Sequence, residues 1–374
     1  MPILGFLGVE PTALGANNEA HLADCLATKD VLTVFNTSAQ WLELAKSFTF
    51  ARLYNPVAIT LPTTPQEVSE SVSCAASVGI KVQARSGGHS YASYSTGGKN
   101  GSLIVDLRMF NEITVDNKTG VASVGGGVRL GNLDLSLYAQ GKRALSHGTC
   151  PDVSIGGHFT HGGYGYVSRA WGLATDTIIA LDVILADGSF IHATASSYPD
   201  IYFALRGAAD SFGIVITFYL KTLAAPKKVV TFSVNMPAVL RSSAIAADGF
   251  LQLQEFSLNS PLMTRNLTLG IVIEGGKEFI LKRCTLVCVS PRYAKRPAAS
   301  HEPVKRRHHY QAHGAHAQPQ PHPQRTGENT DDHPIAPTNS RGVSRPIHEA
   351  RQRLASTYSL KFTTMSPSSL MMIH

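Results

Sequence analysis

Glycine is concentrated in one short segment of this chain, and that segment restricts the fold more than any other. Between residues 148 and 165 the sequence contains Gly148, Gly156, Gly157, Gly162, Gly163 and Gly165. Glycine destabilises a helix because its backbone loses the most conformational freedom on folding, so this density predicts a shaped loop rather than a helix. Small residues also let the backbone approach a ligand closely, which makes the segment a candidate binding element.

A second glycine turn follows a predicted strand–helix–strand unit. The β-branched run 57–61 predicts a strand, Thr64 is the expected cap of a helix to about Val78, and 81–84 is the next predicted strand. The turn 85–90 then reads Arg-Ser-Gly-Gly-His-Ser. Backbone amides in such a turn can converge on a phosphate group.

The rest of the first 282 residues predicts a mixture of strands and helices. Short strands separated by Asn, Asp and Gly turns indicate meandering β structure at 103–107, 113–115 and 121–124. Periodicity and turn residues predict helices over 130–140, 199–205 and 244–256, and strands over 178–185, 213–220, 229–234 and 267–273.

The character of the sequence changes near Arg283. Residues 283–374 hold 9 of the 15 histidines and 10 of the 20 prolines without a sustained period, which predicts disorder. They also hold 13 of the 33 Lys and Arg but only 5 of the 26 Asp and Glu. The formal charge of +7 therefore comes from this tail, and it indicates no nucleic-acid partner. No run of 18 uncharged apolar residues predicts a membrane span.

Histidine and cysteine in the glycine-rich region leave several chemistries open. His147-x-x-Cys150 and His158-x-x-His161 match the spacing of zinc ligands, although structural zinc sites seldom lie among so many glycines, and we expect no metal. Cys150 with His147 or His158 could also form a nucleophile–base pair. A lone cysteine is otherwise often a small buried hydrophobic residue, and the 85–90 turn could simply be a tight turn.

Four motifs in register resemble one known family. They are ARSGGHSYASY at 84–94, GKRALSHGTCP ending at Pro151, IGGHFTHGGYGY at 155–166 and LRGAADSFGIV at 205–215. Together they are similar to the berberine-bridge-like FAD-linked oxidases, and most similar to the fungal gluco-oligosaccharide and chito-oligosaccharide oxidases. The resemblance extends from about Cys25 to Glu274.

The resemblance implies an α+β fold of the FAD-linked-oxidase (PCMH) type. Two α+β subdomains hold the cofactor, and an antiparallel-sheet domain, expected to be truncated here, covers the substrate. We expect an N-terminal entry segment, a PCMH-type FAD-binding domain, a partial substrate domain and a disordered tail, with the family's C-terminal part missing or replaced. Their predicted ranges are 1–50, 51–225, 226–282 and 283–374.

The resemblance also implies the cofactor and its contacts. FAD is expected to be attached twice, through His89 at the 8-methyl carbon and through Cys150 at the 6-position of the flavin ring. Two tethers fix the ring, make it a stronger hydride acceptor and leave an open site for bulky sugars. Tyr91 matches a substrate-contacting aromatic. The other expected FAD contacts are Ser86, Gly87, Gly88, Ser90, Thr149, Gly156, Gly157, His158, Gly162, Gly163, Ile214 and Val215.

The implied activity is oxidation of the anomeric hydroxyl of a sugar to a lactone, with O2 reduced to hydrogen peroxide. One alternative is a secondary-metabolite oxidase, and another is an inactive, truncated FAD-binding remnant, because the family's tyrosine base has no counterpart here. The expected partners are an oligosaccharide or other small-molecule substrate and O2, without nucleic acid or membrane. We expect a monomer.

Secretion is expected although the N-terminus lacks the features of a signal peptide. Three N-glycosylation sequons, at Asn36, Asn117 and Asn266, are compatible with a secretory route. The family resemblance further implies a disulfide between Cys25 and Cys74, a bond typical of oxidising compartments.

Overall fold

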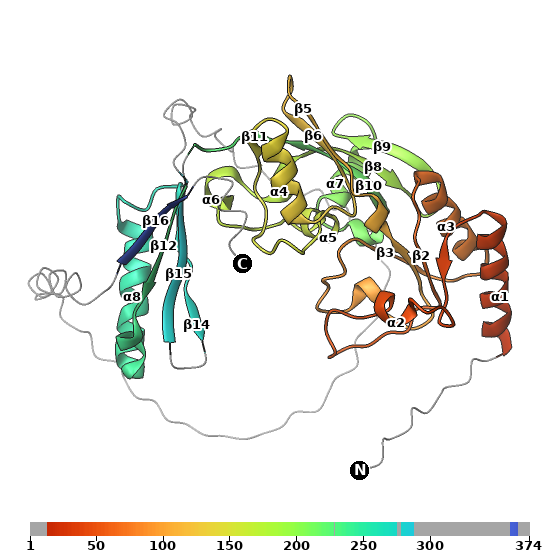
Figure 1. The fold of residues 1–374 in the computed structure, drawn as a ribbon, viewed down its shortest axis with the longest axis horizontal. Helices are drawn as coiled ribbons and strands as arrows, with labels where there is room; N and C mark the ends of the chain where they lie inside the picture. The colour runs from red at the N-terminus through yellow and green to blue at the C-terminus, as the bar shows by residue number, and fades with distance from the viewer. Residues whose placement is uncertain (1–12, 228, 275–277, 288–359, 366–374) are drawn as a thin grey trace, which may run out of the picture. The chain divides into compact units, whose positions relative to one another are not determined.

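The computed structural model describes residues 13–227, 229–274, 278–287 and 360–365. Helices and sheets are mixed along the chain, as predicted (Figure 1). The α-helices are α1 (Ala13–Thr28), α2 (Trp41–Leu44), α3 (Pro65–Ser77), α4 (Leu130–Ala139), α5 (Ile155–Thr160), α6 (Ser168–Trp171), α7 (Pro199–Leu205) and α8 (Ser243–Asn259). Short 3-10 helices are Tyr94–Thr96, Leu107–Met109, Ala174–Thr177, Ala209–Ser211 and Pro237–Arg241.

The first sheet is built around a buried parallel strand. Its order is β1-β2-β4-β3, with β1 (Thr33–Val34), β2 (Ala58–Thr60), β3 (Val82–Arg85) and β4 (Leu103–Asp106). Strand β4 is parallel to both β2 and β3 and buried throughout. The predicted meander is therefore wrong for β4. A continuous apolar run suits a strand covered on both faces, which is typical of parallel sheets.

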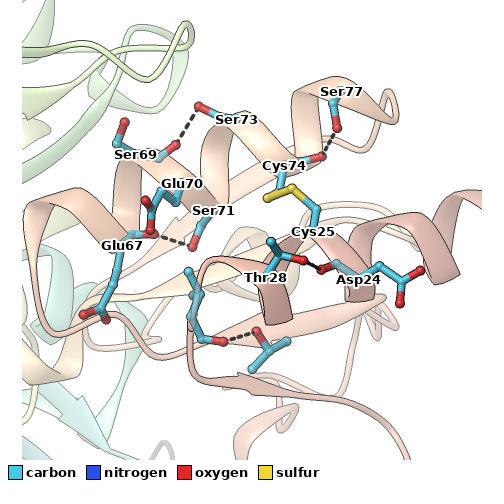
Figure 2. The surroundings of a disulfide bond; sticks show 12 residues. Asp24, Cys25, Thr28, Glu67, Ser69, Glu70, Ser71, Ser73, Cys74 and Ser77 are labelled. Atoms are coloured by element: carbon cyan, nitrogen blue, oxygen red, sulfur yellow. Dashed lines mark hydrogen bonds between the residues drawn. A yellow bond between two sulfur atoms is a disulfide. The ribbon is translucent and has the colours of Figure 1, made fainter.

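Helix α3 confirms the predicted start signals and packs against α1. Thr64 Oγ1 accepts a hydrogen bond from the Glu67 backbone N–H at 3.2 Å, so the hydroxyl caps the helix as expected. Figure 2 shows the two helices side by side, joined by the Cys25–Cys74 disulfide that the family resemblance implies. Ser71, in the same view, satisfies its hydroxyl by donating to the Glu67 carbonyl at 2.7 Å.

The second sheet carries the largest hydrophobic core. Its five strands are antiparallel in the order β5-β6-β10-β8-β9. Helix α4 contributes Leu130, Leu133 and Leu137 to this core, the buried face that its predicted periodicity requires. The strands are β5 (Ile113–Asp116), β6 (Val121–Gly125), β8 (Ile178–Ile184), β9 (Phe190–Thr194) and β10 (Ile214–Lys221).

The strands of a third sheet follow Pro226 in the chain. Helix α8 comes between the first and second of these strands in sequence. Strand β12 pairs with both β15 and β16, and β15 also pairs with β13 and β14. The bounds are β12 (Val229–Asn235), β13 (Leu267–Thr268), β14 (Val272–Glu274), β15 (Glu278–Val287) and β16 (Leu360–Met365). A small sheet pairs β7 (Arg143–Ala144) with β11 (Leu223–Ala224).

Two of these strands fall inside the segment predicted to be disordered. The last residues of β15 and all of β16 belong to 283–374, so the prediction of disorder is wrong for them. Each contains β-branched residues and pairs with distant β12, a contact that no local period reveals. The rest of 283–374 lies outside the described residues, and the domain boundaries stay predictions. No helix in the described ranges is long and apolar enough to cross a bilayer.

Candidate cofactor site

The two glycine-rich motifs line one cavity of about 460 Å³. Its lining comes from the turn after β3, from α5 and from β10. Of the predicted site residues, it brings together Ser86, Gly87, Gly88, His89, Ser90, Gly156, Gly157, His158 and Val215. Tyr91, Thr149, Cys150, Gly162, Gly163 and Ile214 are not part of this lining.

The glycine-rich segment is not wholly a loop, because residues 155–160 form helix α5. Close packing against the 85–90 turn explains why glycine is tolerated there. A Cβ on Gly156 would lie 2.6 Å from Ser86 Cβ, so only glycine lets the helix approach the turn this closely. Ser86 Oγ then accepts from the Gly156 N–H at 3.3 Å and donates to the Gly126 carbonyl at 2.5 Å. The prediction of a loop is therefore wrong for these six residues, since tertiary contact outweighs propensity.

Two features of the cavity lining are unfilled among the described residues. Gly157 borders empty space, and Ser154 has a hydroxyl without a hydrogen-bond partner. A Cβ on Gly157 would meet no heavy atom within 4 Å, although its neighbour Gly156 has no such freedom. Ser154 is buried, and its Oγ has no hydrogen-bond partner among the described residues. Buried hydroxyls normally have a partner, so this atom is suited to a bound group. The sequence prediction missed Ser154; its place before Ile-Gly-Gly at the start of a helix was the only local signal.

His158 is held neutral in the cavity lining. Its Nε2 accepts a hydrogen bond from the Gly148 N–H at 2.8 Å. Burial, and then the nearby His147, lower the pKa of His158 to about 4. His147 has the opposite shift. Burial opposes its charge, but the Asp134 carboxylate, 2.7 Å from Nε2, and a hydrogen bond to the Gly148 carbonyl outweigh burial and raise the pKa of His147.

These contacts weigh against the zinc and cysteine-nucleophile alternatives. Both ring nitrogens of His147 and Nε2 of His158 already have hydrogen-bond partners. In the described ranges no three His, Cys, Asp or Glu side chains gather as a metal site. Cys150 is free and exposed, so the alternative of a small buried hydrophobic residue does not apply to it.

His89 lies beside an aromatic pair and near the Cys150 turn. The ring of Phe48 is 4.5 Å from that of His89 and 5.3 Å from that of Tyr91, measured between centroids. Burial lowers the pKa of His89, followed by the positive charge of Arg129, while Asp152 acts in the opposite direction. Arg129 in turn donates a hydrogen bond to the Asp152 carbonyl. The turn that carries Cys150 and Asp152 is thus within electrostatic reach of His89.

A buried arginine, also missed in the sequence, anchors the start of the 85–90 turn. Arg85 Nη1 donates to the Leu44 carbonyl at 2.6 Å, and Nε donates to Asp106 Oδ2 at 2.8 Å. Asp106 is 1% exposed and is also bonded by Arg108 at 2.8 Å. The side chain therefore ties β3, β4 and α2 together directly before the glycines.

Comparison with known proteins identifies the domain that carries this cavity. Residues 56–194 match the family model of the FAD binding domain. These residues are therefore similar to FAD binding domains. The domain begins just before β2 and ends with β9, so it includes both glycine motifs, His89 and Cys150.

Relatives of this chain include several oligosaccharide oxidases. The chain is 44% identical over 241 residues to a xylooligosaccharide oxidase of Thermothelomyces thermophilus, covering 64% of this chain and 48% of that relative. It thus spans about half the length of this relative. The predicted resemblance to FAD-linked oligosaccharide oxidases is confirmed.

Solved structures confirm the FAD-linked-oxidase fold. A xylooligosaccharide oxidase from Myceliophthora thermophila in complex with xylobiose has a TM-score of 0.72 and 31% identity, covering 94% of this chain and 62% of that one. A glucooligosaccharide oxidase from Acremonium strictum, described with a 6-S-cysteinyl, 8α-N1-histidyl FAD, has a TM-score of 0.67 and 33% identity. The second alignment covers 74% of this chain and 56% of that structure.

The residues around the cavity fit a cofactor such as FAD. The empty space at Gly157 admits a flat or extended group, and the unpartnered Ser154 Oγ can hydrogen-bond to it. The turn 86–90 lines the cavity and has no bulky side chain at Gly87 and Gly88, so its backbone can approach a ligand closely. Space, a close backbone and a free hydroxyl are features that can hold a cofactor with phosphate groups.

Two neighbouring glycines provide a matched test of this fit. We expect Gly156→Ala to lower the free energy of unfolding by about 1–3 kcal/mol, because its methyl group collides with Ser86. Gly157→Ala should change it by less than about 1 kcal/mol, since no protein atom is in the way. The Gly157 variant should nevertheless lose most of its bound FAD. Urea unfolding and the flavin absorbance of purified protein measure the two effects, and full FAD content in Gly157→Ala contradicts the assignment.

Proposed function

We propose that this chain is the flavin-binding part of an FAD-dependent sugar oxidase, with FAD attached through His89 and Cys150. The observation that carries the proposal is the position of His89 in the cavity lining, within electrostatic reach of the turn that holds the free Cys150. An FAD with cysteinyl and histidyl bonds is described for the Acremonium strictum glucooligosaccharide oxidase, which shares this fold.

FAD supplies a hydride acceptor that passes two electrons to O2. In the proposed reaction the anomeric carbon of a sugar loses a hydride and its hydroxyl loses a proton, which forms a lactone. O2 receives the two electrons and two protons, which forms hydrogen peroxide. The chain's own contribution is to fix the flavin and to present an open sugar surface beside it.

The aromatic pair next to His89 supports a sugar substrate. Tyr91 is 81% exposed and Phe48 is 45% exposed, so both rings offer apolar faces to solvent beside the proposed tether. Aromatic faces with a polar tip suit the mixed apolar and hydroxyl surface of a sugar. We therefore propose Tyr91 as a substrate contact, as the family resemblance implies.

The remaining predicted FAD contacts stay part of the proposal. Gly162 and Gly163 have positive φ values of 104° and 74°, and a Cβ on Gly163 would lie 2.5 Å from Ala174 Cβ. This backbone shape can only be kept by glycine at Gly163. Val215 lines the cavity, whereas the adjacent Ile214 packs in the core beside it. We propose that Thr149, Gly162, Gly163 and Ile214 shape the site around the ring and the adenine end.

Secretion as a monomeric glycoprotein is proposed alongside the activity. The Cys25–Cys74 disulfide, which persists in oxidising compartments, supports it. Asn36 and Asn117 of the sequons are exposed, so both are open to glycosylation.

Peroxide formation by the full chain tests the function. We expect hydrogen peroxide with xylo-, chito- or gluco-oligosaccharides, and none with the same sugars reduced at the anomeric carbon. Peroxide only with aromatic or secondary-metabolite alcohols would favour the alternative substrate class. Covalent flavin without any turnover would show an inactive FAD-binding protein, and the absence of both flavin and peroxide would refute the proposal.

A further inference from the structure

Three hydrogen bonds in series connect helix α4 to the cavity. Asp134 Oδ1 lies 2.7 Å from His147 Nε2, and His147 Nδ1 lies 2.6 Å from the Gly148 carbonyl oxygen. The Gly148 N–H then donates to His158 Nε2 at 2.8 Å. His147 and Asp134 are 11% and 28% exposed in their side chains, so solvent screens the series little.

The donors and acceptors fix the protons on both rings. A carboxylate and a carbonyl can only accept, so both nitrogens of His147 must donate and the ring is an imidazolium. A backbone N–H can only donate, so His158 Nε2 carries no proton. The neutral His158 ring therefore holds its proton on Nδ1, which has no hydrogen-bond partner in the described part of the chain.

We propose that Asp134 and His147 are positioning residues that fix the charge and the tautomer of His158, so that this ring offers one N–H donor to FAD. Gly148 connects the two rings, because its carbonyl oxygen accepts a hydrogen bond from His147 and its N–H donates one to His158. The same peptide leads directly to Cys150, so the pair also restrains the proposed tether turn. The consequence for FAD rests on the proposed function, whereas the histidine states do not.

The electrostatic directions agree with this geometry. The pKa of His147 is raised by Asp134 in spite of burial, and the pKa of His158 is lowered to about 4 by burial and by His147. Asp134 of α4 is the titratable group that acts on His147, and His147 in turn acts on His158 of α5. These directions match the hydrogen-bond pattern, in which a charged His147 ring lies behind a neutral His158 ring and each state stabilises the other.

Nitrogen NMR of the full chain, labelled with 15N-histidine, measures these states directly. Loss of one signal in His147→Gln and another in His158→Gln assigns the two rings. We expect His147 to be doubly protonated and to titrate above the ordinary value of about 6.5. We expect His158 to stay neutral, protonated at Nδ1, until the pH falls to about 4. His147 neutral at pH 7, or His158 protonated at Nε2, would overturn the proposal.

Asp134→Asn provides the directional test, because it removes the charge and keeps the shape. The titration midpoint of His147 should fall and that of His158 should rise, since one loses its anion and the other loses a neighbouring cation. Asp182→Asn is the matched control. Asp182 pairs with His192 at 2.6 Å on the β8–β9 strands, so its replacement should leave both midpoints unchanged. Equal effects of the two substitutions, or no opposed shifts in Asp134→Asn, would also overturn the proposal.

The same pair predicts a pH dependence of stability. The pKa of His147 in the folded state is raised above its unfolded value, so the pair's stabilisation is fully present below about pH 6.5 and is lost as the pH rises through the folded pKa. Asp134→Asn should therefore destabilise the protein more at pH 6 than at pH 9 in urea unfolding. An equal loss at both pH values would contradict the charged state of His147. Flavin content and peroxide formation are measured separately, so failure of the proposed function would be recognised independently.

Discussion

Replacing both His89 and Cys150 with alanine will remove all covalently bound flavin from this protein. Each single variant should keep one bond and remain fluorescent on a denaturing gel, because the two proposed tethers attach to different carbons of the ring. The double variant should give a dark band, and its FAD should be lost on dialysis under denaturing conditions. Intact-protein mass spectrometry measures the same result as the loss of the FAD mass.

His161→Ala is a matched control for this experiment. His161 also lines the cavity, but its Nδ1 lies 3.0 Å from the Gly157 carbonyl oxygen. This contact is made within the end of helix α5. We expect its covalent flavin to be retained. A fluorescent band from the double variant would mean that another residue carries the bond, and a dark band from both single variants would mean that the attachments depend on each other.

Replacing Arg85 with methionine should be among the most destabilising changes in the described structure. Arg85 and Asp106 are 5% and 1% exposed, and removing one partner of a buried ion pair typically costs about 3–5 kcal/mol. Asp106 keeps its contact with Arg108, so we expect a loss near the lower end, about 3 kcal/mol, in the free energy of unfolding. The turn 85–90 should also lose its anchor to Leu44, which should weaken FAD binding.

Arg108→Met separates burial from charge in this test. Arg108 bonds to the same Asp106 oxygen at 2.8 Å, but its side chain is 48% exposed. Exposed ion pairs contribute about 1 kcal/mol or less, so this variant should be close to the parent in urea unfolding. Similar losses for the two variants would show that the buried position of Arg85 is unimportant.

Local signals predicted the elements that depend on local interactions. Helix α3 begins at the predicted cap because Thr64 needs only the Glu67 amide three residues away, and α7 has the predicted bounds, 199–205. Helix α4 followed from the spacing of its buried leucines. Strands β2, β3 and β4 were all predicted, but the parallel pairing of β4 with β2 and β3 was not, because strand order is set by the connections between distant segments.

The site was predicted only as far as its motifs extend. The turn 86–90 and the glycines near 156 were expected together because they match one family, and the cavity lining includes both. Ser154, Arg85 and Asp134 were missed, since a serine, an arginine and an aspartate have no special pattern in the chain. Their roles come from partners that approach only after folding, such as Leu44 for Arg85 and His147 for Asp134.

The sequence by itself determined which residues can carry the chemistry, because glycine, histidine and cysteine in those four motifs have properties that no other residues share. It also determined most helices and strands, because capping and periodicity act over a few residues. Only the tertiary structure decided that 155–160 is a helix, that Gly157 borders open space, and that the pKa of His147 is raised while the pKa of its neighbour His158 is lowered. Each of these depends on segments that are distant in the chain and pack together after folding. Their packing sets the free energy of a local backbone conformation, and their burial of a side chain sets the free energy of charging it.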